Sequence, residues 1–103
     1  MLTSNEQLVM LAIARCGPQA YALAIQDEIR THGHALTLGV LYTVLNRLER
    51  RSFVRHRDGE RTAERGDRPK RFYALTGVGL RQLQSTLRVL DSLRGGALVP
   101  QGA

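Results

Sequence analysis

The sequence contains no tryptophan and a single cysteine, and aromatic residues make up only 5% of its 103 residues, so aliphatic side chains must form the core. With Cys16 as the only thiol, no disulfide can form within the chain, which is typical of proteins in a reducing cytoplasm. The longest apolar run, residues 8–14, is too short to cross a bilayer. The residues before it include an acid but no base, unlike a signal peptide, so we expect a cytoplasmic protein.

The chain also lacks the residue patterns of catalytic and metal centres. Ser-His-Asp and Cys-His spacings, a glycine-rich phosphate loop and paired carboxylates in an apolar setting are all absent. His32 and His34 are close in the sequence, but with Cys16 far away they do not form a metal site, which needs about three or four ligands. We therefore expect no enzyme activity, no metal and no cofactor. We keep a protein that responds to a metal or through its thiol as a further hypothesis.

Positive charge is concentrated in one part of the chain. Fifteen Lys and Arg residues stand against nine acids, which gives a formal net charge of +6 and a pI near 10.7. Ten of these fifteen cations lie in residues 47–71, and all but Lys70 are arginines. Arginine presents a planar fork of donors that matches phosphate groups and guanine edges. The distribution favours a nucleic-acid partner, although a basic segment can also be solvated surface.

The first helix is predicted from its ends. Ser4 followed three residues later by Gln7 has the spacing of a capping box. The apolar run comes next, and Gly17 and Pro18 then end the helix. Because this helix is apolar on nearly every side, we expect part of its surface to face a partner chain.

Two more helices follow, joined by a short connection. The second is predicted over residues 20–32 and the third over residues 38–51, with Thr37 as the N-cap of the third. At about 100° per residue, the apolar side chains of the third helix fall within an arc of about 100°, and polar groups lie opposite. The apolar residues are Leu41, Val44, Leu45 and Leu48, and the opposite residues are Gly39, Tyr42, Thr43, Asn46, Arg47 and Arg50.

Residues 53–75 predict a β-hairpin, because two short segments containing aromatic and charged residues flank a polar, arginine-rich tip. Thr76 then caps a last helix over residues 77–95, and we expect residues 96–103 to be disordered. The leucines of this helix recur at spacings of 3, 4 and 3, which is typical of a coiled-coil seam, although the same stripe can pack on its own domain. The predicted dimerisation residues are Leu80, Leu83, Leu87 and Leu90.

Three helices, a basic hairpin and a fourth helix follow one another in the order of a winged helix-turn-helix. The predicted fold is therefore mainly α with a small β-hairpin, and ends in a C-terminal dimerisation helix. We assign residues 1–76 to a winged-helix DNA-binding domain. The third helix can enter a major groove, which is wide enough to admit an α-helix, while the hairpin contacts the flanking backbone.

Three stretches of the chain resemble the PadR-like family of transcriptional regulators, in its small form with a single C-terminal helix. Residues 17–21 (GPQAY) are similar to the start of that family's second helix. Residues 37–49 (TLGVLYTVLNRLE) resemble its recognition-helix signature, and residues 66–79 (GDRPKRFYALTGVG) its second wing strand and the turn into the last helix. Thr43 and Ala20 stand where the family often has proline and glycine.

The resemblance implies a cytoplasmic, homodimeric repressor that binds double-stranded DNA through a winged helix. It also implies that the C-terminal helix often packs on the N-terminal helix of the partner. Two-fold symmetry then predicts an inverted-repeat operator. Family members often bind phenolic or drug-like ligands at the dimer interface, so this chain can also have a small aromatic effector, of unknown identity. It has no tryptophan, however, to stack on such a ligand.

The predicted DNA contacts come from the third helix and from the hairpin. Tyr42 either contacts DNA or lies half-buried against the hairpin. The cations that follow Asp67 have no acidic neighbour, so we expect the phosphate contacts to centre there. The candidate DNA-binding residues are Thr37, Gly39, Tyr42, Thr43, Asn46, Arg47, Arg50, Arg65, Arg68 and Lys70.

A second class of function also fits the sequence. A winged helix can lose DNA readout and act as a protein-interaction module that uses the leucine seam to join a larger assembly. Binding to a DNA duplex at moderate salt distinguishes the two, because only a DNA-binding regulator retains that affinity.

Overall fold

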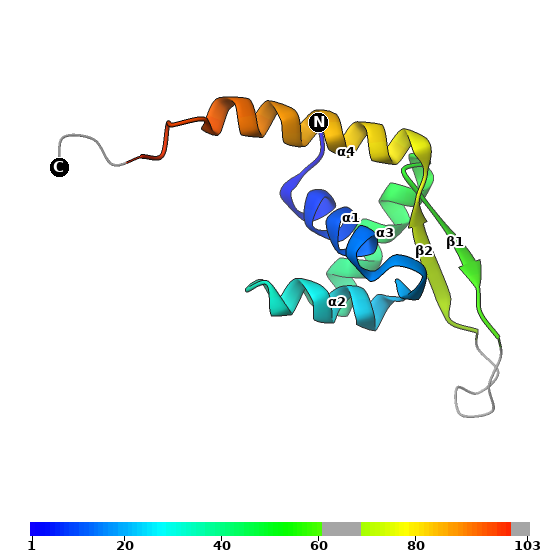
Figure 1. Cartoon of the computed structure of the whole chain (residues 1–103). Coiled ribbons are helices and arrows are strands. Elements are labelled where there is room, and N and C mark those ends of the chain that lie inside the picture. The colour runs from blue at the N-terminus through cyan, green and yellow to red at the C-terminus, as the bar shows by residue number, and fades with distance from the viewer. Residues whose placement is uncertain (61–68, 100–103) are drawn as a thin grey trace.

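The computed structural model describes residues 1–60 and 69–99, and Figure 1 shows how its elements are arranged. Helices form the body of the molecule, a two-stranded antiparallel hairpin extends from one side, and a long last helix lies across the top of the view. This is the predicted winged-helix architecture. The elements are α1 (Ser4–Cys16), the 3₁₀ helix η1 (Gly17–Gln19), α2 (Ala22–Thr31), α3 (Leu38–Arg50), β1 (Val54–Asp58), β2 (Arg71–Leu75) and α4 (Gly77–Arg94).

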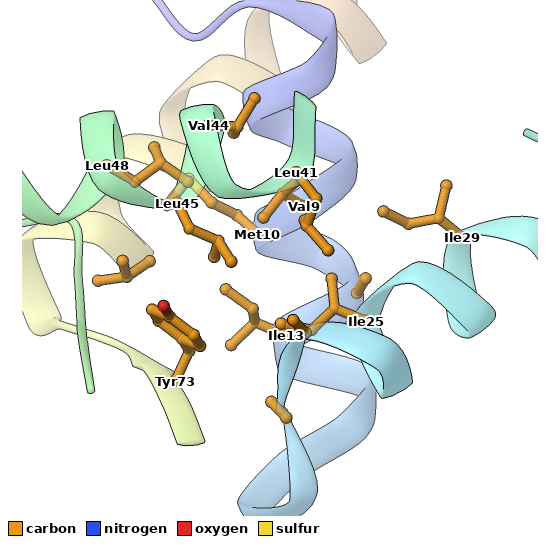
Figure 2. Packing of buried hydrophobic residues seen from close by; sticks show 14 of the residues in the cluster. Val9, Met10, Ile13, Ile25, Ile29, Leu41, Val44, Leu45, Leu48 and Tyr73 are labelled. Atoms are coloured by element: carbon orange, nitrogen blue, oxygen red, sulfur yellow. The ribbon is translucent and has the colours of Figure 1, made fainter. Parts of the chain in front are cut away.

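The core lies where α1, α2 and α3 meet, and the hairpin adds Tyr73 and Val54 to it (Figure 2). Apart from Tyr73, its buried side chains are aliphatic or methionine, as the scarcity of aromatic residues predicted. The apolar arc of α3 is buried as predicted, and Leu41, Leu45 and Leu48 have no exposed surface. One face of α3 is therefore fixed against the body, and the opposite face is left to solvent.

The N-terminus of α1 is capped one residue earlier than predicted. Thr3, and not Ser4, is the N-cap: Thr3 Oγ1 accepts a hydrogen bond from Glu6 N at 3.1 Å, and Glu6 Oε1 accepts one from Thr3 N at 2.8 Å. The side chain of Gln7 donates instead to the Leu2 carbonyl at 3.0 Å. Both pairs have the spacing of a capping box, but only Glu6 is charged. Its carboxylate is held in place by Arg47 of α3 and by Arg51, which follows the helix.

The start of α2 also differs from the prediction, which placed this helix over residues 20–32. Gly17 has a positive φ of 59° at the end of α1, as a C-cap glycine should, and Pro18 follows within η1. Ala20 then lies outside the helix, because its carbonyl accepts a hydrogen bond from Tyr73 N of β2 at 2.8 Å. This bond joins the hairpin to the segment that leads into α2.

The hairpin, called the wing from here on, comprises β1, β2 and the residues between them. The two strands pair antiparallel over the whole of β1, from Val54 to Asp58, as predicted. A further hydrogen bond joins Gly59 N to Lys70 O at 2.7 Å. Residues 61–68, which include the predicted DNA contacts Arg65 and Arg68, lie outside the described part of the chain.

The first turn of α4 lies close against the backbone that precedes the wing. A Cβ atom on Gly79 would lie 1.9 Å from the carbonyl oxygen of Phe53, so the contact requires glycine. Thr76 caps the helix as predicted: its hydroxyl accepts a hydrogen bond from Gly79 N at 2.9 Å and donates one to Ser52 O at 2.6 Å. These contacts fix the direction in which α4 leaves the body.

The leucine stripe of α4 is divided between two environments, which corrects the prediction of one intermolecular seam. Leu83 is 3% exposed and belongs to the core of its own domain, and Leu87 is partly buried against that core. Leu80 and Leu90 are exposed. The stripe is split because the face of α4 that packs on the body is centred on Leu83, so that Leu80 lies at its edge and Leu90 beyond its end.

The second half of α4 extends beyond the body (Figure 1). Val89, Leu90 and Leu93 are all exposed there, and Leu93 reaches 73%. After the helix the described chain makes a turn in which Ala97 N donates to Arg94 O at 2.8 Å. Residues 100–103 lie outside the description, and disorder of residues 96–103 stays a prediction.

Gly79→Ala should destabilise the protein, because its methyl group would overlap a backbone oxygen that no side-chain rotation can move. We expect a loss of about 1–3 kcal/mol in the free energy of unfolding, towards the upper end of the range for overpacking. Gly77→Ala is the matched control in the same helix, since its Cβ would meet only the flexible Arg81 guanidinium, at 3.5 Å. Thermal or urea unfolding measures both, and equal stabilities would contradict the close packing of α4.

Candidate nucleic-acid interface

The exposed face of α3 results from the burial of its other face. Thr37 caps the helix as predicted, by accepting a hydrogen bond from Val40 N at 3.1 Å. With the apolar arc turned inwards, Thr43, Asn46 and Arg50 are exposed on the outer face. A hydroxyl, an amide and a guanidinium thus lie along one side of the helix, and all three groups can bond base edges or phosphates.

The first turn of this face contains a glycine that the packing does not require. A Cβ atom on Gly39 would meet only Thr37 Oγ1, at 4.0 Å. The hydroxyl of Thr43 donates to the Gly39 carbonyl at 2.9 Å, which holds that side chain close to the helix. No side chain therefore covers the backbone at Gly39, and another molecule can approach the N-terminal end of α3 closely.

Tyr42 lies between the outer face of α3 and the wing. Its side chain is 45% exposed, and it lines a cavity of about 550 Å³ together with Tyr21, Lys70, Arg71 and Tyr73. Its ring borders the wing, as in the half-buried alternative, and contact of its exposed part with DNA stays a prediction. Tyr42 of the helix and the wing cations Lys70 and Arg71 thus border one depression.

Tyr73 places a buried hydroxyl beside this cavity. Its side chain is 2% exposed, and the hydroxyl has no hydrogen-bond partner among the described residues. Burial raises the pKa of this phenol, and the nearby Arg71 lowers it by less, so the group is neutral at physiological pH. The sequence did not single out Tyr73, because an aromatic residue in a short strand is most simply explained as core.

Cations of the wing also make contacts within the chain. Lys70 Nζ lies 4.0 Å from the centroid of the Tyr21 ring. The Arg57 guanidinium lies 4.6 Å from the centroid of the Phe72 ring and donates to Pro18 O at 3.1 Å. These contacts hold Lys70, just before β2, and Arg57, within β1, in defined positions. Further exposed cations of β1 and β2 are Arg55 and Arg71.

A hydrogen bond between Glu49 Oε2 and His56 Nδ1 joins the C-terminal end of α3 to β1. The other ring nitrogen of His56 lies 3.9 Å from Asp58 Oδ1. This link fixes the position of the wing relative to the outer face of α3. No sequence pattern predicts this link, because the two residues belong to different elements and no helical or strand spacing relates them.

Arg47, a predicted DNA contact, lies on the opposite flank of α3 and is bound within the chain. Its Nε donates to Glu6 Oε2 at 3.3 Å, and Arg51 Nη1 donates to the same oxygen at 2.9 Å. The Arg47 side chain is nevertheless 40% exposed. The C-terminal half of α3 is therefore attached to the wing on one flank and to α1 on the other.

Other kinds of site find less support in the described part of the chain. None of its helices is both long and apolar enough to span a membrane. Among the same residues, no group of three or more His, Cys, Asp or Glu side chains is arranged to hold a metal ion. Burial, with a contribution from Glu28, raises the pKa of the Cys16 thiol, which disfavours the reactive thiolate.

Solved structures of bacterial regulators have a similar fold. A PadR-like transcription factor from Bacteroides fragilis has a TM-score of 0.74 and 26% identity, over 86% of this chain and 82% of its own. A PadR family transcriptional regulator from Eggerthella lenta has a TM-score of 0.72 and 25% identity, over 87% of this chain and 77% of its own. A transcriptional regulator from Clostridium thermocellum, at 16% identity, shares the fold with a TM-score of 0.74, over 91% of this chain and 92% of its own. A comparison with curated proteins finds no match.

The family model described as the transcriptional regulator PadR-like family matches residues 10–85. This span begins within α1, includes α2, α3 and the wing, and ends in the first half of α4. It therefore covers the exposed face of α3 and the basic strands beside it, and the match implies a DNA-binding regulator. The chain belongs to the PadR-like family of transcriptional regulators.

Proposed function

We propose that the protein is a cytoplasmic, homodimeric and sequence-specific repressor, with α3 in the major groove and the wing on the flanking DNA backbone. One observation carries this proposal: Tyr42 of α3 and Lys70 and Arg71 of the wing line the same depression. A duplex whose major groove receives the outer face of α3 would bring its phosphates to these wing cations. Family membership supports DNA binding, and the geometry supports this division of contacts.

The outer face of α3 supplies the base contacts in this proposal. The amide of Asn46 can pair with adenine through two hydrogen bonds, and the guanidinium of Arg50 can pair with guanine in the same way. Thr43 and the uncovered backbone at Gly39 lie nearer the N-terminus of the helix, which in helix-turn-helix proteins lies deepest in the groove. The wing supplies phosphate contacts from Lys70 and its neighbours, and contacts from Arg65 and Arg68 stay predictions.

The exposed second half of α4 supplies the dimer contact in this proposal. Leu90 and Leu93 are exposed on that segment. A cavity of about 310 Å³ between α1 and α2 is lined by apolar side chains that include Leu8 and Leu11 and by polar side chains that include Glu28. In a two-fold dimer, the end of α4 from each protomer can cover this surface on its partner. The two copies of α3 would then bind an inverted repeat whose half-site centres lie about 34 Å apart.

Replacing Leu90 and Leu93 together by Asp should yield a folded monomer, because it places charges in the dimer contact but leaves the intradomain core intact. Light scattering measures the mass, and circular dichroism checks the fold. Leu98→Asp is the control, since Leu98 is 79% exposed and lies beyond α4. A double variant that remains a dimer would show that the protomers associate through another surface.

Gly39→Ala should separate stability from DNA binding. Because the added methyl group meets open space, the helix should gain about 0.5–1 kcal/mol of stability. The same methyl group would stand on the surface that faces the groove, so affinity for a duplex selected from a random-sequence pool should fall. Thermal unfolding and fluorescence-anisotropy titration measure the two effects. A stabilised variant with unchanged affinity would show that DNA does not approach this turn.

Asn46→Ala and Lys70→Ala should weaken DNA binding in different ways. Asn46→Ala removes hydrogen bonds but no charge, so preference at one base pair per half-site should relax by roughly 1–3 kcal/mol while nonspecific affinity persists. Lys70→Ala should weaken binding to every duplex and reduce the slope of log affinity against log salt by about 0.9 for each phosphate that the protein no longer neutralises. In a symmetric dimer both protomers carry the substitution, so the change in slope is doubled.

Competition binding with single-base variants of the selected duplex, repeated over a series of salt concentrations, measures both effects. Equal losses of specific and nonspecific binding in Asn46→Ala would assign base reading to other residues. An unchanged slope in Lys70→Ala would show that Lys70 does not contact phosphate. If the wild-type protein has no affinity for duplexes at moderate salt, the protein-interaction function becomes the better explanation.

A further inference from the structure

Glu6 is the most deeply buried acidic side chain of the described residues, with 1% of its surface exposed. It lies in the first turn of α1, outside the surface assigned to DNA. Its Oε1 accepts the Thr3 N–H at 2.8 Å, while its Oε2 accepts Arg51 Nη1 at 2.9 Å and Arg47 Nε at 3.3 Å. Both oxygens therefore have partners, and two of these partners come from the end of α3 and the residue that follows it.

These contacts keep the buried carboxylate charged. Burial raises its pKa, but the hydrogen bonds from Thr3 and Arg47 and the charge of Arg51 together lower it further, and the net pKa lies below its ordinary value. A charged acceptor forms shorter and stronger hydrogen bonds than a neutral one. Glu6 can therefore hold a guanidinium in one orientation at physiological pH.

The two arginines are held in different ways. Arg51 uses a terminal nitrogen for Glu6, and its guanidinium also lies 4.6 Å from the centroid of the Phe53 ring, so it packs against the body. Arg47 uses Nε, which leaves its two terminal nitrogens without a hydrogen bond to a described residue. On the helix, Arg47 lies one turn after Thr43 and one turn before Arg50, at the edge of the outer face.

We propose that Glu6 is a positioning residue for DNA readout, which holds Arg47 through Nε so that the free terminal fork of the guanidinium can pair with a guanine in the major groove. The inference rests on the proposed binding of α3 in that groove. A guanidinium that is fixed before binding loses less conformational freedom on contact with DNA, and its fork matches guanine O6 and N7. Glu6 thus acts on base preference although it faces the interior of the protein.

Glu6→Gln tests this role, because glutamine can still accept the Thr3 N–H but offers Arg47 no charge. The measured quantity is the ratio of affinities for the duplex that wild type selects from a random-sequence pool and for a shuffled duplex of the same length. We expect this ratio to fall about tenfold for each half-site, the effect of removing one bidentate pairing with a base, and therefore about a hundredfold in a symmetric dimer. Affinity for the shuffled duplex should be unchanged or higher, because a negative charge has been removed.

Asp27→Asn is the matched control. Asp27 pairs with Arg30 on α2 and both side chains are exposed, so this variant removes the same charge from an arginine pair that does not involve α3. Its affinity ratio should equal that of wild type. A fall of the ratio in Asp27→Asn as large as that in Glu6→Gln would overturn the proposal, since the effect would then follow from net charge alone.

A double-mutant cycle with Arg47→Ala asks whether Glu6 acts through Arg47. If it does, Glu6→Gln should change the ratio no further once Arg47 has been removed. The same loss in both backgrounds would overturn the proposal and leave Glu6 a structural role only. Arg51→Lys should leave the ratio close to wild type, because Arg51 packs against the body.

Arg47→Lys decides the question if Glu6→Gln does not fold. Lysine keeps the positive charge, but its single ammonium cannot bond Glu6 and present a fork at the same time. The ratio should fall about tenfold for each half-site while affinity for the shuffled duplex is retained. An unchanged ratio in Arg47→Lys would overturn the inference alone, whereas a wild-type protein that selects no preferred duplex would overturn the proposed function as well.

Discussion

Leu41, Leu45 and Leu48 of α3 have no exposed surface, and their burial against the body determines where each remaining side chain of the helix points. Burying a leucine contributes about 1.5–3 kcal/mol, whereas an isolated helix as short as α3 is only marginally stable in water. Packing therefore creates the helix and orients it in one step. Thr43, Asn46 and Arg50 face outwards because the apolar arc faces inwards, and the surface that we propose to enter the major groove follows from this burial.

The two flanks of α3 are attached by different kinds of interaction. On one flank, the pair of Glu49 and His56 joins the helix to the wing, and both side chains are partly solvated. On the other flank the Glu6 carboxylate is buried while its arginine partners are about 40% exposed, and a buried charge is costly to leave without a partner. The link to α1 is therefore the stronger constraint on the helix. The wing is attached to α3 by the weaker, partly solvated pair, and Tyr73 and Val54 fix its base in the core.

Helical periodicity and end signals sufficed to predict most of the fold. Thr37, Gly17 and Thr76 act at helix ends as their residue types indicate, because capping depends on local backbone groups. What could not be predicted depends on residues distant in the sequence. Thr3 and Ser4 were equally good caps by spacing, and the choice follows from the arginines at and just after the end of α3 that bind Glu6. The division of the leucine stripe likewise depends on how far the body extends beneath α4, which no spacing encodes.

The positive charge of residues 47–71 likewise cannot be interpreted from the sequence alone, because contacts within the fold determine which cations are free to bind DNA. Counted along the sequence, its cations suggest one broad phosphate-binding surface. In the fold, Arg51 neutralises the buried Glu6 and packs on Phe53, while Arg57 lies on Phe72 and donates to a backbone carbonyl. Counterions are released only by cations that come to lie against phosphates. The salt dependence of DNA binding must therefore be smaller than the charge of the segment suggests, because part of that charge holds α3 and the wing in position.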